Sequence, residues 1–261
     1  MAEKMGTKTM NIGILTTECL SDFGYKTLLP ILNDDSFSVK LAVIDKRPGK
    51  TVVQKIKKNI RRGRGGYIFI MAIKKIIASK KQKTINIKNI CIENKINVIE
   101  TKEPYSNITL NTIKEYNLDV LLLLSGFGII KEPLLSIATM GVLSYHHGNM
   151  RKYRGMPPAF WELYNDEKEV GVTVQILSAG LDCGLPIEER SIKIYKKDSL
   201  SSLRSRLYEE SADMMYKALL KLYRQDYVSG KIDEYGKVYT LPNFRQWIYL
   251  YIKTTGRKLK R

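Results

Sequence analysis

The chain has 261 residues, with 44 Lys and Arg against 26 Asp and Glu, so its formal net charge is +18. A hydrophobic fraction of 44% excludes a chain that is disordered throughout. Three scattered cysteines and two histidines exclude a disulfide scaffold, a cysteine-based zinc site and a three-histidine metal site. We therefore expect no metal, and the cysteine usage predicts a cytoplasmic location. No apolar run reaches the roughly 18 residues that a membrane span requires.

The first half of the chain alternates short apolar runs with stretches that have helical spacing. The predicted strands are residues 10–15, 36–44, 96–99 and 119–124. The predicted helices run through Leu28 and Leu32 and over residues 87–95 and 107–116. Because strands that alternate with helices imply right-handed crossovers, we predict an α/β, Rossmann-like fold with a mostly parallel central sheet. Ligands of such sheets bind beyond the carboxyl ends of the strands.

Most of the positive charge lies in residues 46–83, which contain 14 Lys or Arg and no acidic residue. The rest of the chain carries only 18 − 14 = +4. Two helix-like pieces flank a glycine break at residues 63–66. Three interpretations compete for this insertion: a solvated segment docked on the domain, a contact with an anionic membrane surface, or a contact with nucleic acid. The second would place the protein at the membrane periphery, and the apolar residues between Tyr67 and Ile77 offer a homodimer interface.

The loop after the strand at residues 119–124 contains Ser125, Gly126, Phe127 and Gly128. Its two glycines allow a ligand to approach the backbone closely. The loop lacks the third glycine of the dinucleotide fingerprint, so we do not predict NAD.

Residues 141–184 contain the most informative pattern. A strand at residues 142–145 delivers His146 to the carboxyl end of the sheet. Because adjacent strand residues point to opposite faces, only one of His146 and His147 can face a cleft. A basic loop, a helix at residues 158–164 and a further strand follow. A glycine-bounded loop then carries Asp182.

This stretch resembles the 10-formyltetrahydrofolate-dependent formyltransferases, which act on glycinamide ribonucleotide, methionyl-tRNA or nucleotide-linked amino sugars. The matching motifs here are Ser144-Tyr145-His146, Tyr153-Arg154-Gly155, Gly171-Val172-Thr173 and Leu181-Asp182-Cys183-Gly184. The resemblance implies a catalytic domain over residues 9–200, interrupted by the basic insertion at about 46–83. It leaves residues 201–261 as a short helical and basic C-terminal extension.

The resemblance implies that His146 is the catalytic histidine and Asp182 the catalytic aspartate. The family's asparagine falls on Ser144, whose hydroxyl is a shorter donor. The co-substrate implied is 10-formyltetrahydrofolate, with no metal. Its expected binding residues are Ser125, Gly126, Phe127, Gly128, Gly180 and Leu181. Three cations either form a solvated face or bind an anionic acceptor: Arg151, Lys152 and Arg154.

Formyl transfer to an amine passes through a tetrahedral oxyanion, which hydrogen-bond donors stabilise. A protonated His146 suits that role, and Asp182 can accept the proton of the amine. We expect transfer to a primary amine on a nucleotide-linked amino sugar or a similar small acceptor. The alternatives are a methionyl-tRNA formyltransferase and a catalytically impaired binding protein in which Ser144 marks lost activity.

The last quarter of the chain contains an edge-type strand at residues 187–195 and one helix from about residue 199 to 224. Asp198 or Ser199 is its predicted N-cap. The tail after residue 229 is shorter than the C-terminal domain usual in methionyl-tRNA members of the family, which favours a small acceptor.

Overall fold

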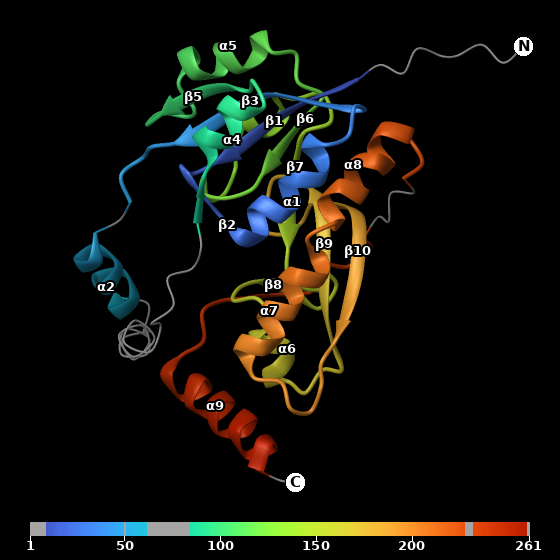
Figure 1. Cartoon of the computed structure of the whole chain (residues 1–261). Helices are drawn as coiled ribbons and strands as arrows, with labels where there is room; N and C mark the ends of the chain where they lie inside the picture. The colour runs from blue at the N-terminus through green and yellow to red at the C-terminus, as the bar shows by residue number, and fades with distance from the viewer. Residues whose placement is uncertain (1–8, 50, 62–83, 228–231, 260–261) are drawn as a thin grey trace, which may run out of the picture.

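The computed structural model describes residues 9–49, 51–61, 84–227 and 232–259. Its centre is a seven-stranded sheet with the order β10-β9-β7-β6-β1-β3-β5 (Figure 1). The strands are β1 (Met10–Thr16), β3 (Phe37–Asp45), β5 (Asn97–Thr101), β6 (Val120–Leu123), β7 (Val142–His146), β9 (Glu169–Ile176) and β10 (Leu185–Lys193). Neighbours from β5 to β7 pair in parallel, whereas β9 and β10 pair antiparallel at one edge. The predicted mostly parallel, Rossmann-like fold is confirmed.

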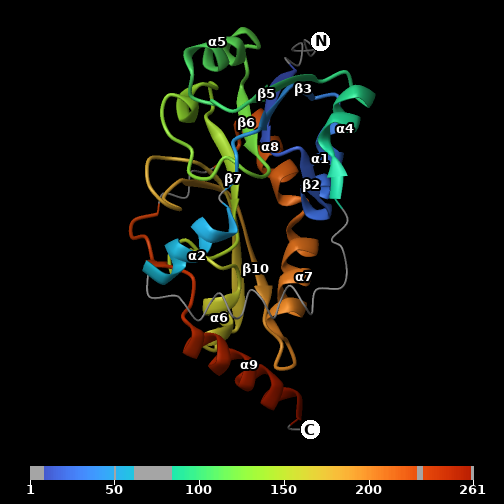
Figure 2. The same ribbon diagram turned by 90° about the vertical axis from the view of Figure 1, so that its left-hand side faces the viewer.

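Helices cover both faces of the sheet (Figures 1 and 2). On one face α1 (Asp22–Leu32), α4 (Ile87–Glu93), α7 (Leu200–Ser211) and α8 (Met214–Arg224) pack against side chains such as Ile12 and Ile14. On the other face α5 (Asn107–Glu115) and the short 3-10 helix η1 (Leu134–Ser136) pack against Leu15 and Leu121. The apolar runs of the strands are therefore buried on both sides, as their composition predicts.

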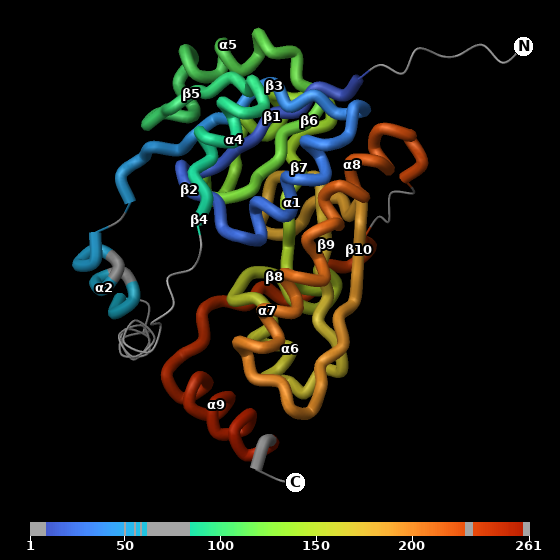
Figure 3. Tube along the Cα trace, viewed as in Figure 1, coloured from blue at the N-terminus to red at the C-terminus, as the bar shows by residue number. Residues whose placement is uncertain are grey.

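Two small strand pairs lie outside the main sheet. β2 (Cys19–Ser21) pairs antiparallel with β4 (Thr84–Asn86), close to the start of α1 (Figure 3). β8 (Tyr153–Gly155) pairs in parallel with β11 (Lys237–Tyr239), so the C-terminal segment returns to the loop that follows β7. The last described element is α9 (Phe244–Leu259), whose Trp247 packs on Phe160 of α6 (Phe160–Tyr164) at 4.6 Å between ring centroids.

The basic insertion contains α2 (Val52–Arg61), which stands away from the sheet in Figure 1. Val52 and Val53 on this helix are exposed. The first of the two predicted helix-like pieces is therefore a helix. The second piece, with the candidate homodimer face between Tyr67 and Ile77, lies outside the described residues.

The prediction of one helix from residue 199 to 224 is wrong, because the structure has α7 and α8 with a break between them. The Tyr145 hydroxyl lies in the break, where it donates to the Ser211 carbonyl at 2.7 Å. The same hydroxyl accepts the Met215 N–H at 2.9 Å. An uninterrupted helix would join that carbonyl directly to that N–H. The tyrosine is therefore inserted into the helical hydrogen-bond ladder, which is one of the known causes of a helix break.

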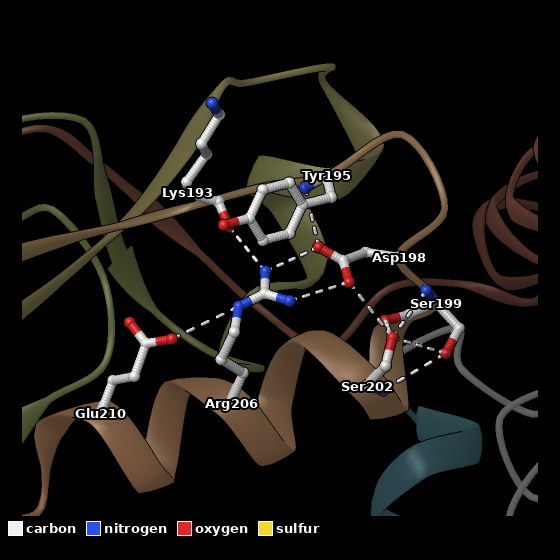
Figure 4. A network of polar contacts seen from close by, with 7 residues as sticks. All are labelled: Lys193, Tyr195, Asp198, Ser199, Ser202, Arg206 and Glu210. Atoms are coloured by element: carbon white, nitrogen blue, oxygen red, sulfur yellow. Dashed lines mark hydrogen bonds and ion pairs between the residues drawn. The ribbon is translucent and has the colours of Figure 1, made fainter.

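A polar network around the buried Asp198 fixes the start of α7 (Figure 4). Ser199 is the N-cap and forms a capping box with Ser202. Arg206 donates two hydrogen bonds, of 3.0 and 2.7 Å, to the buried Asp198 carboxylate. Its guanidinium also lies 4.6 Å from the centroid of the Tyr195 ring. These contacts join the end of β10 to α7.

One core cluster includes side chains on both sides of residue 200, the predicted end of the catalytic domain. Val172 and Val174 of β9 share it with Leu203 of α7 and Met215 of α8. None of the described helices is long and apolar enough to cross a membrane.

Candidate active site

The two adjacent histidines point to opposite faces of the sheet, as expected. His147 lies among aromatic rings on the helical face, with ring centroids 5.4 Å from Phe23 and 4.9 Å from Tyr208. Burial lowers the pKa of His147 to about 3, so it is neutral at pH 7. His146 is 5% exposed and lies on the other face. The structure therefore leaves His146 as the histidine that is available for charge and proton chemistry.

His146 contacts the predicted aspartate. Its Nδ1 lies 3.3 Å from Oδ1 of Asp182, and its Nε2 lies 2.8 Å from the Tyr153 carbonyl oxygen. Both neighbours accept hydrogen bonds, so the ring is fully partnered when both nitrogens carry protons. The other carboxylate oxygen of Asp182 accepts the Gly155 N–H at 2.7 Å. The centre of the site is therefore a buried imidazole whose two nitrogens both have partners.

The charges of His146 and Asp182 stabilise each other. Burial lowers the pKa of His146, but the Asp182 carboxylate and the Tyr153 carbonyl outweigh it, and the net pKa is raised. Burial likewise raises the pKa of Asp182, but the hydrogen bond and charge of His146 outweigh it, and the net pKa is lowered. The pair therefore favours an imidazolium beside a carboxylate near neutral pH.

The loop from β7 to β8 requires a glycine beside the imidazole. A Cβ at Gly148 would lie 2.6 Å from Nε2 of His146 and 2.8 Å from the Tyr153 carbonyl oxygen. Any side chain at this position would push the two groups apart. Gly148 therefore permits the hydrogen bond that fixes the ring.

Arg154 holds the loop that carries Asp182. Its Nε donates to the Gly236 carbonyl at 2.7 Å, and its Nη1 donates to the Leu181 carbonyl at 3.3 Å and to Cys183 Sγ at 2.6 Å. Its guanidinium also lies 5.6 Å from the centroid of the Tyr235 ring. The guanidinium thus joins the Asp182 loop to the C-terminal segment before β11.

The other two predicted acceptor-binding cations also have partners within the chain. Arg151 forms a two-pronged ion pair with Glu189, with distances of 2.5 and 3.2 Å. Lys152 lies 3.4 Å from a carboxylate oxygen of Glu167. Both pairs are exposed, so an anionic ligand can compete for these cations at little cost.

The predicted folate loop lies at the carboxyl end of β6, next to β7. The Ser125 hydroxyl is 3.0 Å from the Thr16 hydroxyl and accepts the Thr17 N–H at 3.1 Å. Gly126, Phe127 and Gly128 all have positive φ angles, between 51° and 71°. The loop is therefore a tight turn tied to the end of β1.

The first residues of the basic insertion hold this loop. Asp45 accepts the Phe127 N–H at 3.2 Å and forms a two-pronged ion pair with Arg47. Arg47 in turn donates to the Phe127 carbonyl at 2.9 Å. The basic segment is therefore joined to the candidate folate loop through its second residue. A hollow of about 650 Å³ beside Lys46 is lined by Glu100 and its neighbours, and by none of the residues around His146.

Three buried polar residues complete the surroundings of His146. Ser144 is 9% exposed and donates weakly to the Tyr145 carbonyl at 3.4 Å. Gln175 and Glu162, 1% and 3% exposed, were not predicted as site residues. Burial raises the pKa of Glu162 to about 7, although the charge of His146 opposes the rise. The available sequence signal was a polar residue inside the apolar strand GVTVQIL and an acid inside the aromatic stretch FWELY.

Comparison with known proteins gives a consistent result. A family model described as formyl transferase matches residues 40–219. The methionyl-tRNA formyltransferase of Caldanaerobacter subterraneus subsp. tengcongensis is 29% identical over 137 residues, which are 52% of this chain and 44% of that protein. The corresponding enzyme of Thermosynechococcus vestitus is 33% identical over 104 residues, 40% of this chain and 31% of its own length. The chain thus matches less than half the length of these relatives.

Solved structures with the same fold extend over more of the chain. An N-formyltransferase from Helicobacter canadensis, in complex with folinic acid and dTDP-3-aminofucose, has a TM-score of 0.59 and 15% identity. The match covers 94% of this chain and 80% of that one. Glycinamide ribonucleotide transformylase 1 from Symbiobacterium toebii has a TM-score of 0.58 and 14% identity, and the match covers 88% and 95% of the two chains.

Proposed function

Because the chain belongs to the formyl transferase family, we propose that it transfers a formyl group from 10-formyltetrahydrofolate to a primary amine. The observation that carries this proposal is the buried His146–Asp182 pair at the carboxyl end of β7, inside the matched residues. Its charged form is favoured near neutral pH. A fixed cation of this kind stabilises negative charge that develops in a transition state.

The proposed reaction needs no covalent enzyme intermediate. The amine nitrogen attacks the formyl carbon, and the carbonyl electron pair moves to the oxygen. When this tetrahedral oxyanion collapses, the bond from carbon to N10 of the folate breaks. The amine loses one proton and N10 gains one. In our proposal, His146 supplies positive charge beside the oxyanion, and the Asp182 carboxylate receives the amine proton directly or through water.

We propose that the folate binds between the loop at Ser125–Gly128 and the loop containing Gly180 and Leu181. The first loop follows β6 at its carboxyl end, where ligands of parallel sheets bind, and the second loop carries Asp182, which contacts His146. Positive φ angles at Gly126 and Gly180 mark tight turns at which backbone groups can face a ligand. Backbone N–H and C=O groups of this kind can pair with the edge of a pterin ring.

For the acceptor, we propose an amino sugar linked to a nucleotide. The Helicobacter canadensis protein with this fold was solved with a nucleotide-linked amino sugar, which sets the first class to test. Arg151 and Lys152 can exchange their exposed carboxylate partners for the phosphates of such a ligand. The test is a panel of amino-sugar nucleotides with 10-formyltetrahydrofolate, analysed by mass spectrometry. Absence of a formylated product from every member would reject this acceptor class.

Methionyl-tRNA is the second candidate acceptor, because the curated relatives that match this chain are methionyl-tRNA formyltransferases. The exposed cationic helix α2 supports it, since binding of tRNA requires phosphate neutralisation. Formylation of charged initiator tRNA, and an affinity that falls steeply with salt, are the expected results for this candidate. A salt-insensitive affinity or an unmodified tRNA would reject it.

A further inference from the structure

Formyl transfer requires an N–H or O–H donor aimed at the formyl oxygen. The side chains around His146 differ in whether their donors are already engaged in other hydrogen bonds. His146 has both ring nitrogens engaged, one with Asp182 and the other with the Tyr153 carbonyl. Ser144 has a single hydroxyl proton, which points to the Tyr145 carbonyl. A free donor must therefore come from another side chain near His146.

Gln175 is opposite Ser144 in the antiparallel pairing of β7 with β9, and Thr173 is opposite His146. Side chains of directly opposed residues lie on the same face of a sheet. Ser144 and His146 are two residues apart on one strand, so they share that face as well. The Gln175 carboxamide therefore lies on the face of the His146–Asp182 pair.

The orientation of this carboxamide is fixed by the loop that carries Asp182. The Gly184 N–H donates to Gln175 Oε1 at 2.9 Å. A backbone N–H can only donate, so the atom that it contacts is the amide oxygen, and the NH₂ group is directed elsewhere. Within the described part of the chain, that NH₂ group has no hydrogen-bond acceptor, although Gln175 is only 1% exposed. An amide N–H group without an acceptor in the described chain is free to donate to a ligand.

We propose that Gln175 is a catalytic residue of the formyl transfer, whose Nε2 donates to the formyl oxygen as it becomes an oxyanion. This assignment rests on the proposed function. It divides the work between two groups: Gln175 supplies the hydrogen bond, and His146 supplies the charge.

The decisive variant is Gln175→Glu, which keeps the size of the side chain and the acceptor for the Gly184 N–H but removes the donor. We expect kcat to fall about 100-fold or more, with KM for the folate changed less than about 3-fold. Gln225→Glu makes the same change on an exposed residue at the end of α8 and should keep the wild-type rate. Gln175→Met, which also lacks the donor but carries no charge, replaces Gln175→Glu if the latter does not fold.

A measurement on the unmodified protein tests the contact without requiring turnover. The side-chain NH₂ resonances of Gln175, assigned by triple-resonance NMR, should shift when 5-formyltetrahydrofolate saturates the protein. A folded Gln175 variant with kcat within about 3-fold of wild type, or unshifted NH₂ resonances at saturation, would overturn the assignment. A wild-type protein that formylates no acceptor but shows the shift would instead refute the proposed function and leave the contact standing.

Discussion

The carboxylate of Asp182 lies against both the ring and the anchoring loop of His146, with Oδ1 3.3 Å from Nδ1 of the imidazole. Its second oxygen accepts the Gly155 N–H from the strand that supplies the Tyr153 carbonyl to the same ring. One acidic residue therefore sets both the charge and the position of the histidine.

Asp182→Asn should move the alkaline limb of the pH profile. The asparagine can still accept the Gly155 N–H, but it removes the negative charge that raises the pKa of His146. The pKa of His146 then falls, because burial disfavours the charged ring and the largest opposing group is gone. Because the imidazolium is the active form in our proposal, kcat/KM of the variant should decline at a pH at least one unit lower than in wild type. A limb at the same pH in both proteins would show that His146 does not titrate in the mechanism.

Glu162→Gln should change how stability depends on pH. Burial raises the pKa of Glu162 to about 7 in the folded protein, above its value in the unfolded chain. Between these two pKa values the folded state binds more protons than the unfolded state. The free energy of unfolding of the wild type therefore falls as the pH rises toward 7. The variant does not titrate, and its stability relative to wild type should increase by about 2 kcal/mol from pH 4.5 to pH 8. Urea denaturation at several pH values measures this difference, and a constant difference would contradict the expectation.

Tyr145→Phe should destabilise the protein, because it removes the hydroxyl that bridges α7 and α8. The Ser211 carbonyl and the Met215 N–H would both lose their partner. We expect a loss of about 1–3 kcal/mol in the free energy of unfolding. Tyr216→Phe is the matched control, since among the described residues its hydroxyl hydrogen-bonds only to the side chain of Asp34. An equal loss in the two variants would contradict a special role for the bridge.

Arg154→Lys should weaken the Asp182 loop, whereas Arg151→Lys should not. A lysine cannot reproduce the contacts of Arg154 with Gly236 and the Asp182 loop. We expect KM for the folate to rise about 10-fold in Arg154→Lys, because a misplaced loop binds ligand less well. The exposed pair of Arg151 with Glu189 contributes less than about 1 kcal/mol, so that variant should keep its melting temperature. An equal change of the folate KM in Arg154→Lys and Arg151→Lys would show that Arg154 does not anchor the Asp182 loop.

Most of the sheet was predictable because its strands are apolar runs bounded by turn residues. The single edge strand at residues 187–195 is found as β10 at the sheet edge, shifted by two residues. The break between α7 and α8 was not predictable, since it depends on Tyr145, which lies 66 residues from Ser211 in sequence. The apolar stripe continues through the break and gives no local signal of it.

For the site, the motif order identified His146 and Asp182, which the structure brings into contact. The contribution of the C-terminal segment was missed, because β11 is three residues long and its Gly236 acts only through backbone groups. Gln175 was missed because a single polar residue in an apolar strand has no meaning until the strand pairing is known. The proposed roles of Arg151, Lys152 and Arg154 stay predictions.

The most direct test of the account uses wild-type protein and His146→Asn with 10-formyltetrahydrofolate and an amino-sugar nucleotide. The mass increase of the acceptor by one formyl group is followed with time. We predict formylated product with wild type and a rate at least about 100-fold lower with His146→Asn, because the variant lacks the buried cation. Equal rates in the two proteins would contradict the central claim that the His146–Asp182 pair performs formyl transfer.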